Sequence, residues 1–142
     1  MQKNRISLFA FILILTAAGL LAACTKTPAA LAPTPTPATL SVSPAQAHAA
    51  VQQGVYVLDV RSQEEWDQFH IAGSTLIPLE KLPSRLGQLP KDRAILVVCL
   101  SGVRSQSGAA LLQQAGFTQV SYMSGGLQAW IKAGYPVEGI SP

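Results

Sequence analysis

Five consecutive apolar residues, Ala94-Ile95-Leu96-Val97-Val98, constrain the fold of this 142-residue chain more than any other feature. A short run rich in Val and Ile is typical of a strand that is buried on both faces of a parallel sheet. The segment 105–114, rich in Ala and Leu, predicts a helix shortly downstream. Because a doubly buried strand needs helices on both faces of its sheet, this run favours an α/β architecture.

The rest of the chain repeats this alternation of short apolar runs and helical patterns. Ser43-Pro44 carries an N-cap followed by proline, and Ser62-Gln63-Glu64-Glu65 matches a capping box. We expect strands at 40–42, 55–60, 75–78, 94–98 and 119–123, and helices at 44–53, 63–69, 79–89 (interrupted at Pro83), 105–115 and 126–133. Strands and helices alternating at these spacings predict one domain with a parallel sheet.

Cys99 follows the strand at 94–98 and precedes the predicted helix. A helix N-terminus stabilises an anion through its free N–H groups and its dipole, and Arg104 adds a positive charge. Ligands of parallel sheets bind beyond the carboxyl ends of the strands. This position predicts a reactive thiolate, although a cysteine at a strand end is also commonly a small buried hydrophobic residue.

The N-terminus predicts export. Two basic residues within the first seven precede an almost wholly apolar stretch at 8–21, which is the layout of a secretory signal and too short to be assigned as a spanning helix. Leu21-Ala22-Ala23-Cys24 resembles the bacterial lipobox, in which the cysteine carries lipid. We expect a lipoprotein signal peptide at 1–23, with a soluble secreted form or an uncleaved anchor as alternatives.

Residues 24–40 contain four prolines spaced by Thr and Ala, a composition that favours an extended tether behind the lipidated Cys24. The globular domain is expected at 41–138 and a C-terminal tail at 139–142. With Cys24 lipidated, Cys99 is the single free thiol, since the chain has two cysteines. Without residues 1–23, eight Lys or Arg face seven Asp or Glu, which excludes nucleic-acid binding by charge.

A series of motifs spanning about residues 41–138 resembles the single-domain rhodanese family. They are Leu58-Asp59-Val60-Arg61, Glu65-Trp66, His70-Ile71-Ala72-Gly73-Ser74, Ile77-Pro78, Cys99 with Ser101-Gly102-Val103-Arg104-Ser105, Gly116-Phe117, and Gly125-Gly126 with Trp130. The resemblance implies a rhodanese-like α/β fold with a five-stranded, mainly parallel sheet and helices on both faces. It also implies a sulfurtransferase in which Cys99 accepts a sulfane sulfur and becomes a persulfide.

Sulfur transfer suits the chemistry of this loop, because both the thiolate nucleophile and the persulfide product are anions. Successive N–H groups would surround the terminal sulfur, and the Ser101 hydroxyl adds a donor. Arg104 either binds a sulfonate or sulfite leaving group or points at an Asp elsewhere. The substrate-binding residues are therefore predicted to be Leu100, Ser101, Gly102, Val103 and Arg104.

The length of the loop separates sulfur chemistry from phosphate chemistry. Four residues lie between Cys99 and Arg104, whereas phosphatases that share this fold place five there. The shorter loop resembles the sulfurtransferase form. Leu100 stands where many active relatives have a basic residue, which leaves persulfide donors other than thiosulfate open.

Other polar and aromatic residues are interpreted as scaffold. Asp59 and Arg61 are expected to form a pair that braces the active-site surface, His70 to bond backbone, and His48 to lie on the surface. Trp66 and Trp130 are predicted to be packing residues. Separated histidines and one free thiol do not make a metal site, and no nucleotide motif is present, so no metal or cofactor is expected.

We therefore expect a monomeric enzyme anchored by lipid on Cys24 to the bacterial cell envelope, on its periplasmic or extracellular face. It would pass sulfur from thiosulfate or another small persulfide donor to cyanide or a thiol acceptor. A noncatalytic rhodanese-like module that carries sulfur or docks a membrane partner is the alternative.

Overall fold

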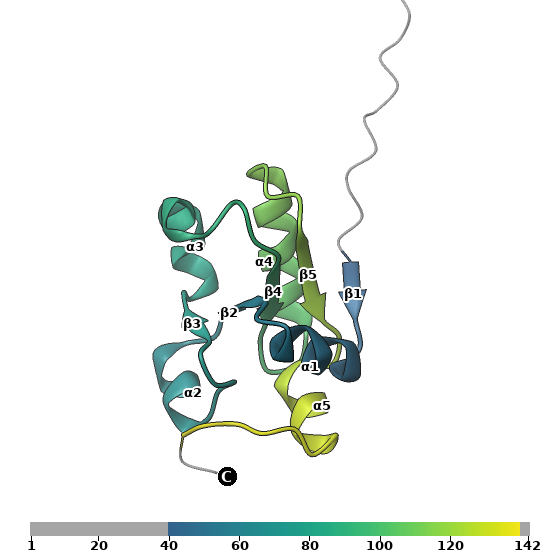
Figure 1. The fold of residues 1–142 in the computed structure, drawn as a ribbon. Helices are drawn as coiled ribbons and strands as arrows, with labels where there is room; N and C mark the ends of the chain where they lie inside the picture. The colour runs from purple at the N-terminus through teal and green to yellow at the C-terminus, as the bar shows by residue number, and fades with distance from the viewer. Residues whose placement is uncertain (1–39, 140–142) are drawn as a thin grey trace, which may run out of the picture. The chain divides into compact units, whose positions relative to one another are not determined.

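The computed structural model describes residues 40–139 (Figure 1). The elements in chain order are β1 (Leu40–Val42), α1 (Pro44–Gln52), β2 (Tyr56–Asp59), α2 (Gln63–Gln68), β3 (Thr75–Leu76), η1 (Leu79–Lys81), α3 (Leu82–Arg85), η2 (Leu86–Gln88), β4 (Ile95–Val98), α4 (Val103–Gln114), β5 (Val120–Met123) and α5 (Gly126–Lys132).

The five strands form one sheet in the order β1-β5-β4-β2-β3, and every neighbouring pair is parallel. The apolar strand β4 lies in the centre, and all four of its residues are buried. Asp59 at the end of β2 lies opposite Val98 at the end of β4. The expected α/β fold with a five-stranded parallel sheet is confirmed, and the register places Asp59 beside the start of the Cys99 loop.

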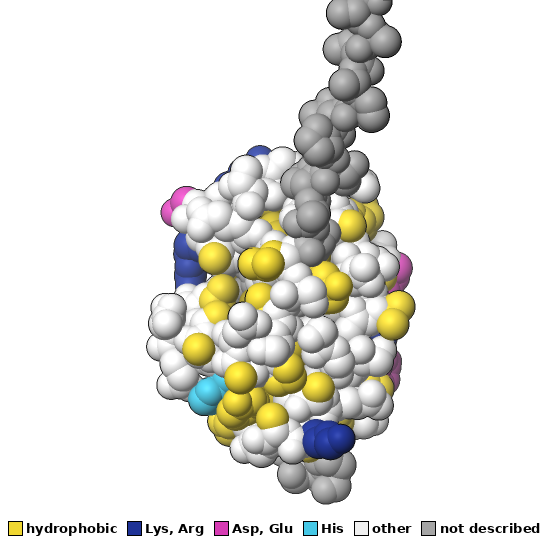
Figure 2. All heavy atoms as spheres, turned by 90° about the vertical axis from the view of Figure 1, so that its right-hand side faces the viewer, with side chains coloured by type: hydrophobic (Ala, Val, Ile, Leu, Met, Phe, Trp, Pro, Cys, Tyr) yellow, Lys and Arg dark blue, Asp and Glu magenta, His cyan; other side chains and the backbone are white. Residues whose placement is uncertain are grey.

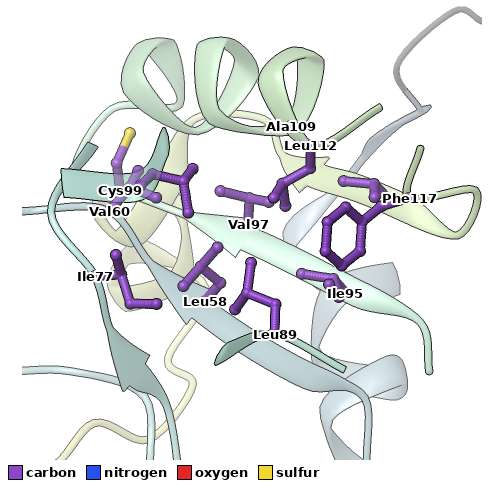
Figure 3. Close-up of a cluster of buried hydrophobic side chains, with 12 residues drawn as sticks. Leu58, Val60, Ile77, Leu89, Ile95, Val97, Cys99, Ala109, Leu112 and Phe117 are labelled. Atoms are coloured by element: carbon purple, nitrogen blue, oxygen red, sulfur yellow. The ribbon is translucent and has the colours of Figure 1, made fainter. Parts of the chain in front are cut away.

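Side chains of the central strands alternate between two hydrophobic clusters, one on each face of the sheet. The cluster that contains Leu58 and Val97 packs under α3 and α4, and Cys99 lies at one end of it (Figure 3). The cluster that contains Val57 and Leu96 packs against α1 and α5. Helices therefore cover both faces, as the sequence predicts, and the thiol lies on the α4 side.

Capping explains where α1 and α2 begin. The hydroxyl of Ser43 accepts the N–H of Gln46, and the hydroxyl of Ser62 accepts the N–H of Glu65. In both helices the side chain of the third residue returns a hydrogen bond to the cap backbone, which completes the capping box. Both predicted helix starts are confirmed.

The segment 79–89 differs from its prediction of a helix interrupted at Pro83. It forms three short turns, η1, α3 and η2, and Pro83 lies within the first turn of α3. At that position the missing N–H of proline has no intrahelical partner to lose. Helix α4 also begins earlier than the predicted residue 105, at Val103, because Gly102 turns the chain with a φ of +99°.

The aromatic residues show one further correction. His48 is half-buried, not on the open surface: its ring stacks on Tyr135 at 4.2 Å and meets Trp130 edge-on at 5.5 Å. The reason is that α1 packs against α5, which carries Trp130. Trp130 is 1% exposed, as expected of a packing residue. Figure 2 shows this side of the molecule, over β1, α1 and α5, where apolar side chains are scattered among polar atoms.

Trp66, in α2, and His70 form a second stack. Their ring centroids are 3.5 Å apart, and Trp66 is half-buried. His70 Nδ1 lies 3.0 Å from the carbonyl oxygen of Trp66, which confirms the predicted bond from His70 to the backbone. These residues serve packing and local hydrogen bonding.

The predicted signal peptide (1–23), Cys24, and nearly all of the tether and the C-terminal tail lie outside the described residues. Within residues 40–139, no helix is both long and apolar enough to cross a bilayer.

Candidate active site

Cys99 is the first residue after β4, and the loop that follows returns the chain to α4. The cysteine is fully buried. Its Sγ accepts the backbone N–H of Gly102 at 3.2 Å and that of Ser105 at 3.3 Å. Because N–H donors stabilise negative charge on their acceptor, this arrangement suits a thiolate or a persulfide anion at the position the sequence predicts.

Ser105 is a member of the site that the sequence reasoning left out of its substrate-binding set. Its side chain is fully buried, its Oγ lies 3.6 Å from Sγ, and it donates to the carbonyl oxygen of Gly102 at 2.8 Å. The signal was present in the sequence, since Ser105 is a polar residue on the helix face that also carries Ala109 and Leu112. Its hydroxyl holds the loop closed and lies within reach of the sulfur.

Helix α5 holds the loop from behind. The N–H of Leu127 donates to the carbonyl oxygen of Cys99 at 2.8 Å, and the N–H of Gln128 donates to that of Leu100 at 3.0 Å. A carbonyl and the N–H of the next residue share one planar peptide unit and point in opposite directions. Fixing these two carbonyls toward α5 therefore fixes the orientation of the first peptide units of the loop.

Two glycines make this close approach possible. Gly126 has a φ of +55°, and a Cβ there would overlap the carbonyl oxygen of Cys99 and lie 2.5 Å from that of Leu100. A Cβ on Gly102 would lie 3.0 Å from the backbone nitrogen of Gly125. The sequence showed these glycines as parts of a motif, but their role as backbone contacts appears only in three dimensions.

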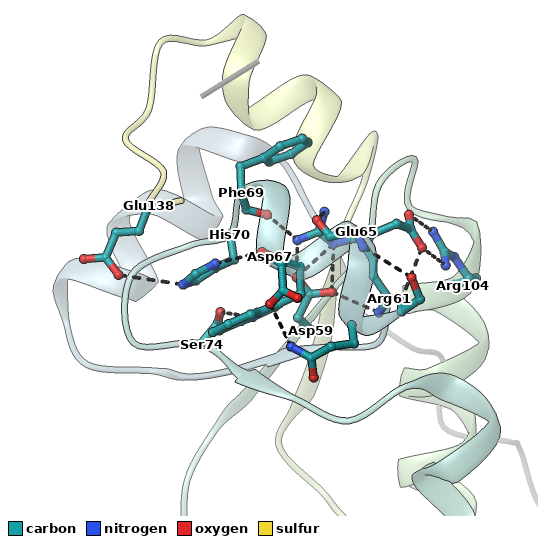
Figure 4. A network of polar contacts seen from close by, with 12 residues as sticks. Asp59, Arg61, Glu65, Asp67, Phe69, His70, Ser74, Arg104 and Glu138 are labelled. Atoms are coloured by element: carbon teal, nitrogen blue, oxygen red, sulfur yellow. Dashed lines mark hydrogen bonds and ion pairs between the residues drawn. The ribbon is translucent and has the colours of Figure 1, made fainter. Parts of the chain in front are cut away.

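Asp59 and Arg61 form the pair that the sequence predicts, and both are buried. Arg61 Nη2 lies 2.8 Å from Asp59 Oδ2, and Nε lies 3.0 Å from both carboxylate oxygens. The guanidinium also donates to the carbonyl oxygens of Glu65 at 3.0 Å and Phe69 at 2.6 Å (Figure 4). Arg61 therefore ties the end of β2 to α2, and these added bonds compensate for the cost of burying both charges.

Arg104 pairs with Glu65 of α2, a residue to which the sequence reasoning assigned no site role. Nη1 and Nη2 each donate to one carboxylate oxygen at 2.6 Å (Figure 4). These bonds, with a further one from the Ser62 backbone, lower the pKa of Glu65 to about 2. Hydrogen bonding to Glu65 likewise raises the pKa of Arg104. Of the two roles left open for Arg104, the structure contains an ion pair, but its partner is Glu65 and not the expected Asp; contact with a leaving group stays a prediction.

The remaining predicted loop residues line the outside of the turn. Ser101 is exposed, Leu100 is partly exposed, and Val103 is 69% exposed at the first position of α4. Among residues 40–139, no group of three His, Cys, Asp or Glu side chains is placed to hold a metal ion.

The strand-end cysteine, its N–H donors and the parallel sheet agree with a comparison against protein families, which matches residues 43–133 to the Rhodanese-like domain. The chain belongs to the rhodanese-like family. A solved rhodanese-related protein from Thermoplasma volcanium superimposes with a TM-score of 0.66 at 33% identity, covering 70% of this chain and 97% of that one. The family predicted from the sequence motifs is therefore confirmed.

Relatives with curated names include sulfurtransferases. A protein of Allochromatium vinosum named sulfurtransferase is 34% identical over 85 residues, which cover 60% of this chain and 79% of the relative. The probable adenylyltransferase/sulfurtransferase MoeZ of Mycobacterium tuberculosis is 40% identical over 82 residues, or 56% of this chain. This chain therefore matches only 21% of the length of MoeZ.

The close approach of Gly126 to the rhodanese loop predicts an unusually costly Gly126→Ala substitution. We expect it to lower the free energy of unfolding by about 3 kcal/mol, from left-handed strain plus overlap with the loop carbonyls. Gly134→Ala is the matched control, since Gly134 also has a positive φ (+78°) but nothing within 4 Å of its Cβ position. It should cost only about 1 kcal/mol. Urea unfolding followed by circular dichroism measures both, and equal costs would contradict the contact.

The Glu65–Arg104 pair predicts a defined pH dependence of stability. Because the pKa of Glu65 is lowered from 4.5 to about 2, its stabilisation is fully present above pH 4.5 and is lost as the pH falls toward 2. The pair is partly exposed, so Glu65→Gln should cost about 1 kcal/mol at pH 7, and this difference should shrink steadily below pH 4.5. Urea titrations from pH 7 to pH 3 test this. A difference between the two proteins that stays constant from pH 7 to pH 3 would contradict the role of this ion pair.

Proposed function

We propose that this protein is a sulfurtransferase that moves a sulfane sulfur from a small donor to a thiophilic acceptor through a persulfide on Cys99. The observation that carries the proposal is the sulfur of Cys99 accepting two backbone N–H groups in a glycine-dependent loop at the end of β4. The sulfurtransferase names of relatives at 34% and 40% identity support the same reaction class.

With thiosulfate as donor, the Cys99 thiolate attacks the outer sulfur and forms a new S–S bond. The bond between that sulfur and the sulfonate sulfur breaks, and its electron pair leaves with sulfite. The enzyme then carries Cys99–S–S⁻, whose negative charge the loop N–H groups stabilise. Attack of cyanide on the terminal sulfur releases thiocyanate and restores the thiolate; a thiol acceptor would take the sulfur in the same way.

Mass spectrometry tests the persulfide. The full chain is incubated with thiosulfate, alkylated and digested with trypsin, which releases the peptide 94–104 that contains Cys99. We expect a gain of about 32 Da, the mass of one sulfur atom, on this peptide. Cys99→Ser should abolish the gain, whereas Cys24→Ala should keep it.

Thiocyanate production from thiosulfate and cyanide then distinguishes an enzyme from a carrier. A persulfide that forms on Cys99 but is not turned over would favour the noncatalytic sulfur-carrier module. Absence of the adduct with every sulfane donor tested would rule out the enzyme and leave partner docking.

We also propose that the protein is exported and held at the cell envelope by lipid on Cys24. The support is in the sequence: basic residues at the start, the apolar stretch 8–21 and the lipobox-like Leu21-Ala22-Ala23-Cys24. Cys24→Ala should move the protein from the membrane fraction to the soluble fraction, with Cys99→Ala as the control that stays bound. Continued membrane association of Cys24→Ala would indicate an uncleaved apolar anchor in place of lipid.

A further inference from the structure

Four charged side chains beside the Cys99 loop cancel in pairs. Asp59 binds Arg61, and Glu65 binds Arg104, each through short hydrogen bonds between a guanidinium and both carboxylate oxygens. Arg61 is buried and also donates to two backbone carbonyl oxygens, those of Glu65 in α2 and of Phe69 just after it. Arg104 is the more accessible cation, with 40% of its side chain exposed, and both of its terminal nitrogens are bound by Glu65.

The side chains of the loop itself add no charge. Leu100 and Val103 are apolar, and Val103 is one of the most exposed large hydrophobic side chains among residues 40–139. The exposed Ser101 is polar but neutral. A donor that reaches the thiol therefore meets backbone N–H groups, an apolar rim and an ion pair with no net charge.

Resting on the sulfurtransferase function proposed above, we infer that this site prefers sulfane donors that carry one negative charge and an apolar group, such as thiosulfonates R–SO₂–S⁻, over the thiosulfate dianion. Glu65 is the residue that sets this preference. Its carboxylate occupies both terminal nitrogens of Arg104, the guanidinium predicted from the sequence as one possible contact for a sulfonate.

The physical reason is the charge of the donor. Thiosulfate must either displace Glu65 from Arg104 or give up water around two negative charges at a site whose ion pair offers no net positive charge in return. A thiosulfonate carries only one charge, so it loses less hydration free energy on entering this site. Its organic group replaces the second charge and can cover the exposed Val103 side chain, which removes apolar surface from water.

The chemistry needs no further reactant. The Cys99 thiolate attacks the outer sulfur of R–SO₂–S⁻ and forms the Cys99–S–S⁻ persulfide. The bond from that sulfur to the sulfonyl sulfur breaks, and its electron pair leaves with the sulfinate R–SO₂⁻. No proton is transferred, and two negative charges are present before and after the step.

Three donors separate charge from apolarity: thiosulfate, methanethiosulfonate and benzenethiosulfonate. The readout is kcat/KM for thiocyanate formation, with cyanide as acceptor and the full chain as enzyme. Comparing the ratio between two donors across variants cancels their intrinsic difference in reactivity. Glu65→Gln should raise the thiosulfate to methanethiosulfonate ratio about tenfold, because one repulsive charge is removed while the amide oxygen can still accept hydrogen bonds.

Leu100→Arg should shift the same ratio in the same direction by about tenfold, because it adds a cation to the rim of the loop. It also keeps the test decisive if Glu65→Gln folds poorly. Two variants serve as controls. Glu64→Gln removes an exposed negative charge from α2, the helix that carries Glu65, and Thr118→Arg adds an exposed positive charge just before β5. Neither control should change the ratio by more than about twofold.

Val103→Ser tests the apolar half of the inference. It should lower the benzenethiosulfonate to methanethiosulfonate ratio about threefold and leave the thiosulfate to methanethiosulfonate ratio unchanged. Donor ratios that Glu65→Gln and Leu100→Arg leave unchanged, while Cys99 still gains sulfur, would overturn this inference and preserve the sulfurtransferase. No persulfide on Cys99 from any of the three donors would overturn both.

Discussion

The active-site geometry depends on the backbone contact between α5 and the Cys99 loop. N–H groups of α5 hold the carbonyls of Cys99 and Leu100, and Gly126 allows the two backbones to approach so closely. This contact orients the peptide units at the start of the loop, and the Ser105 hydroxyl closes its other end through Gly102. The anion-stabilising donors around Sγ are thus positioned before any substrate binds, which is the condition for electrostatic preorganisation.

Strand β4 makes the contact possible because it lies in the centre of the sheet. Its neighbours β2 and β5 bring two other chain segments to the same carboxyl edge. From β2 come Asp59 and Arg61, which anchor α2, and after β5 comes the Gly125-Gly126 turn that begins α5. A parallel sheet thereby gathers a thiol, a buried ion pair and a glycine turn from separate parts of the chain.

The charge around the thiol differs from what isolated residues suggest. Arg104 next to a cysteine loop indicates an anion site, but in the fold its guanidinium is already bound by a carboxylate on α2. Stabilisation of a thiolate or persulfide then comes from backbone N–H groups more than from a free cation. Such a site stabilises one negative charge on sulfur without a strong attraction for highly charged anions in solution.

The sequence by itself determined the local elements and the position of Cys99 at a strand end. Short apolar runs, including the one before Cys99, and the capping serines predict strands, helix starts and a thiol at a strand end, because each depends on hydrogen bonds and burial within a few residues. The pairing of Asp59 with Arg61 was also predicted, since only one residue separates them in the sequence. The start of α4 was less predictable, because Gly102 adopts its positive φ where the loop lies against the backbone of Gly125, a distant segment of the chain.

Only the tertiary structure decided which distant groups meet. Glu65 and Arg104 are 39 residues apart, and nothing in their local sequence says that one would neutralise the other. The same holds for Gly126 against the loop carbonyls and for His48 against Tyr135 and Trp130. The physical reason is that ion pairing and close backbone approach depend on the final arrangement of helices on the sheet, whereas a sequence pattern records only what each segment requires of its own neighbours.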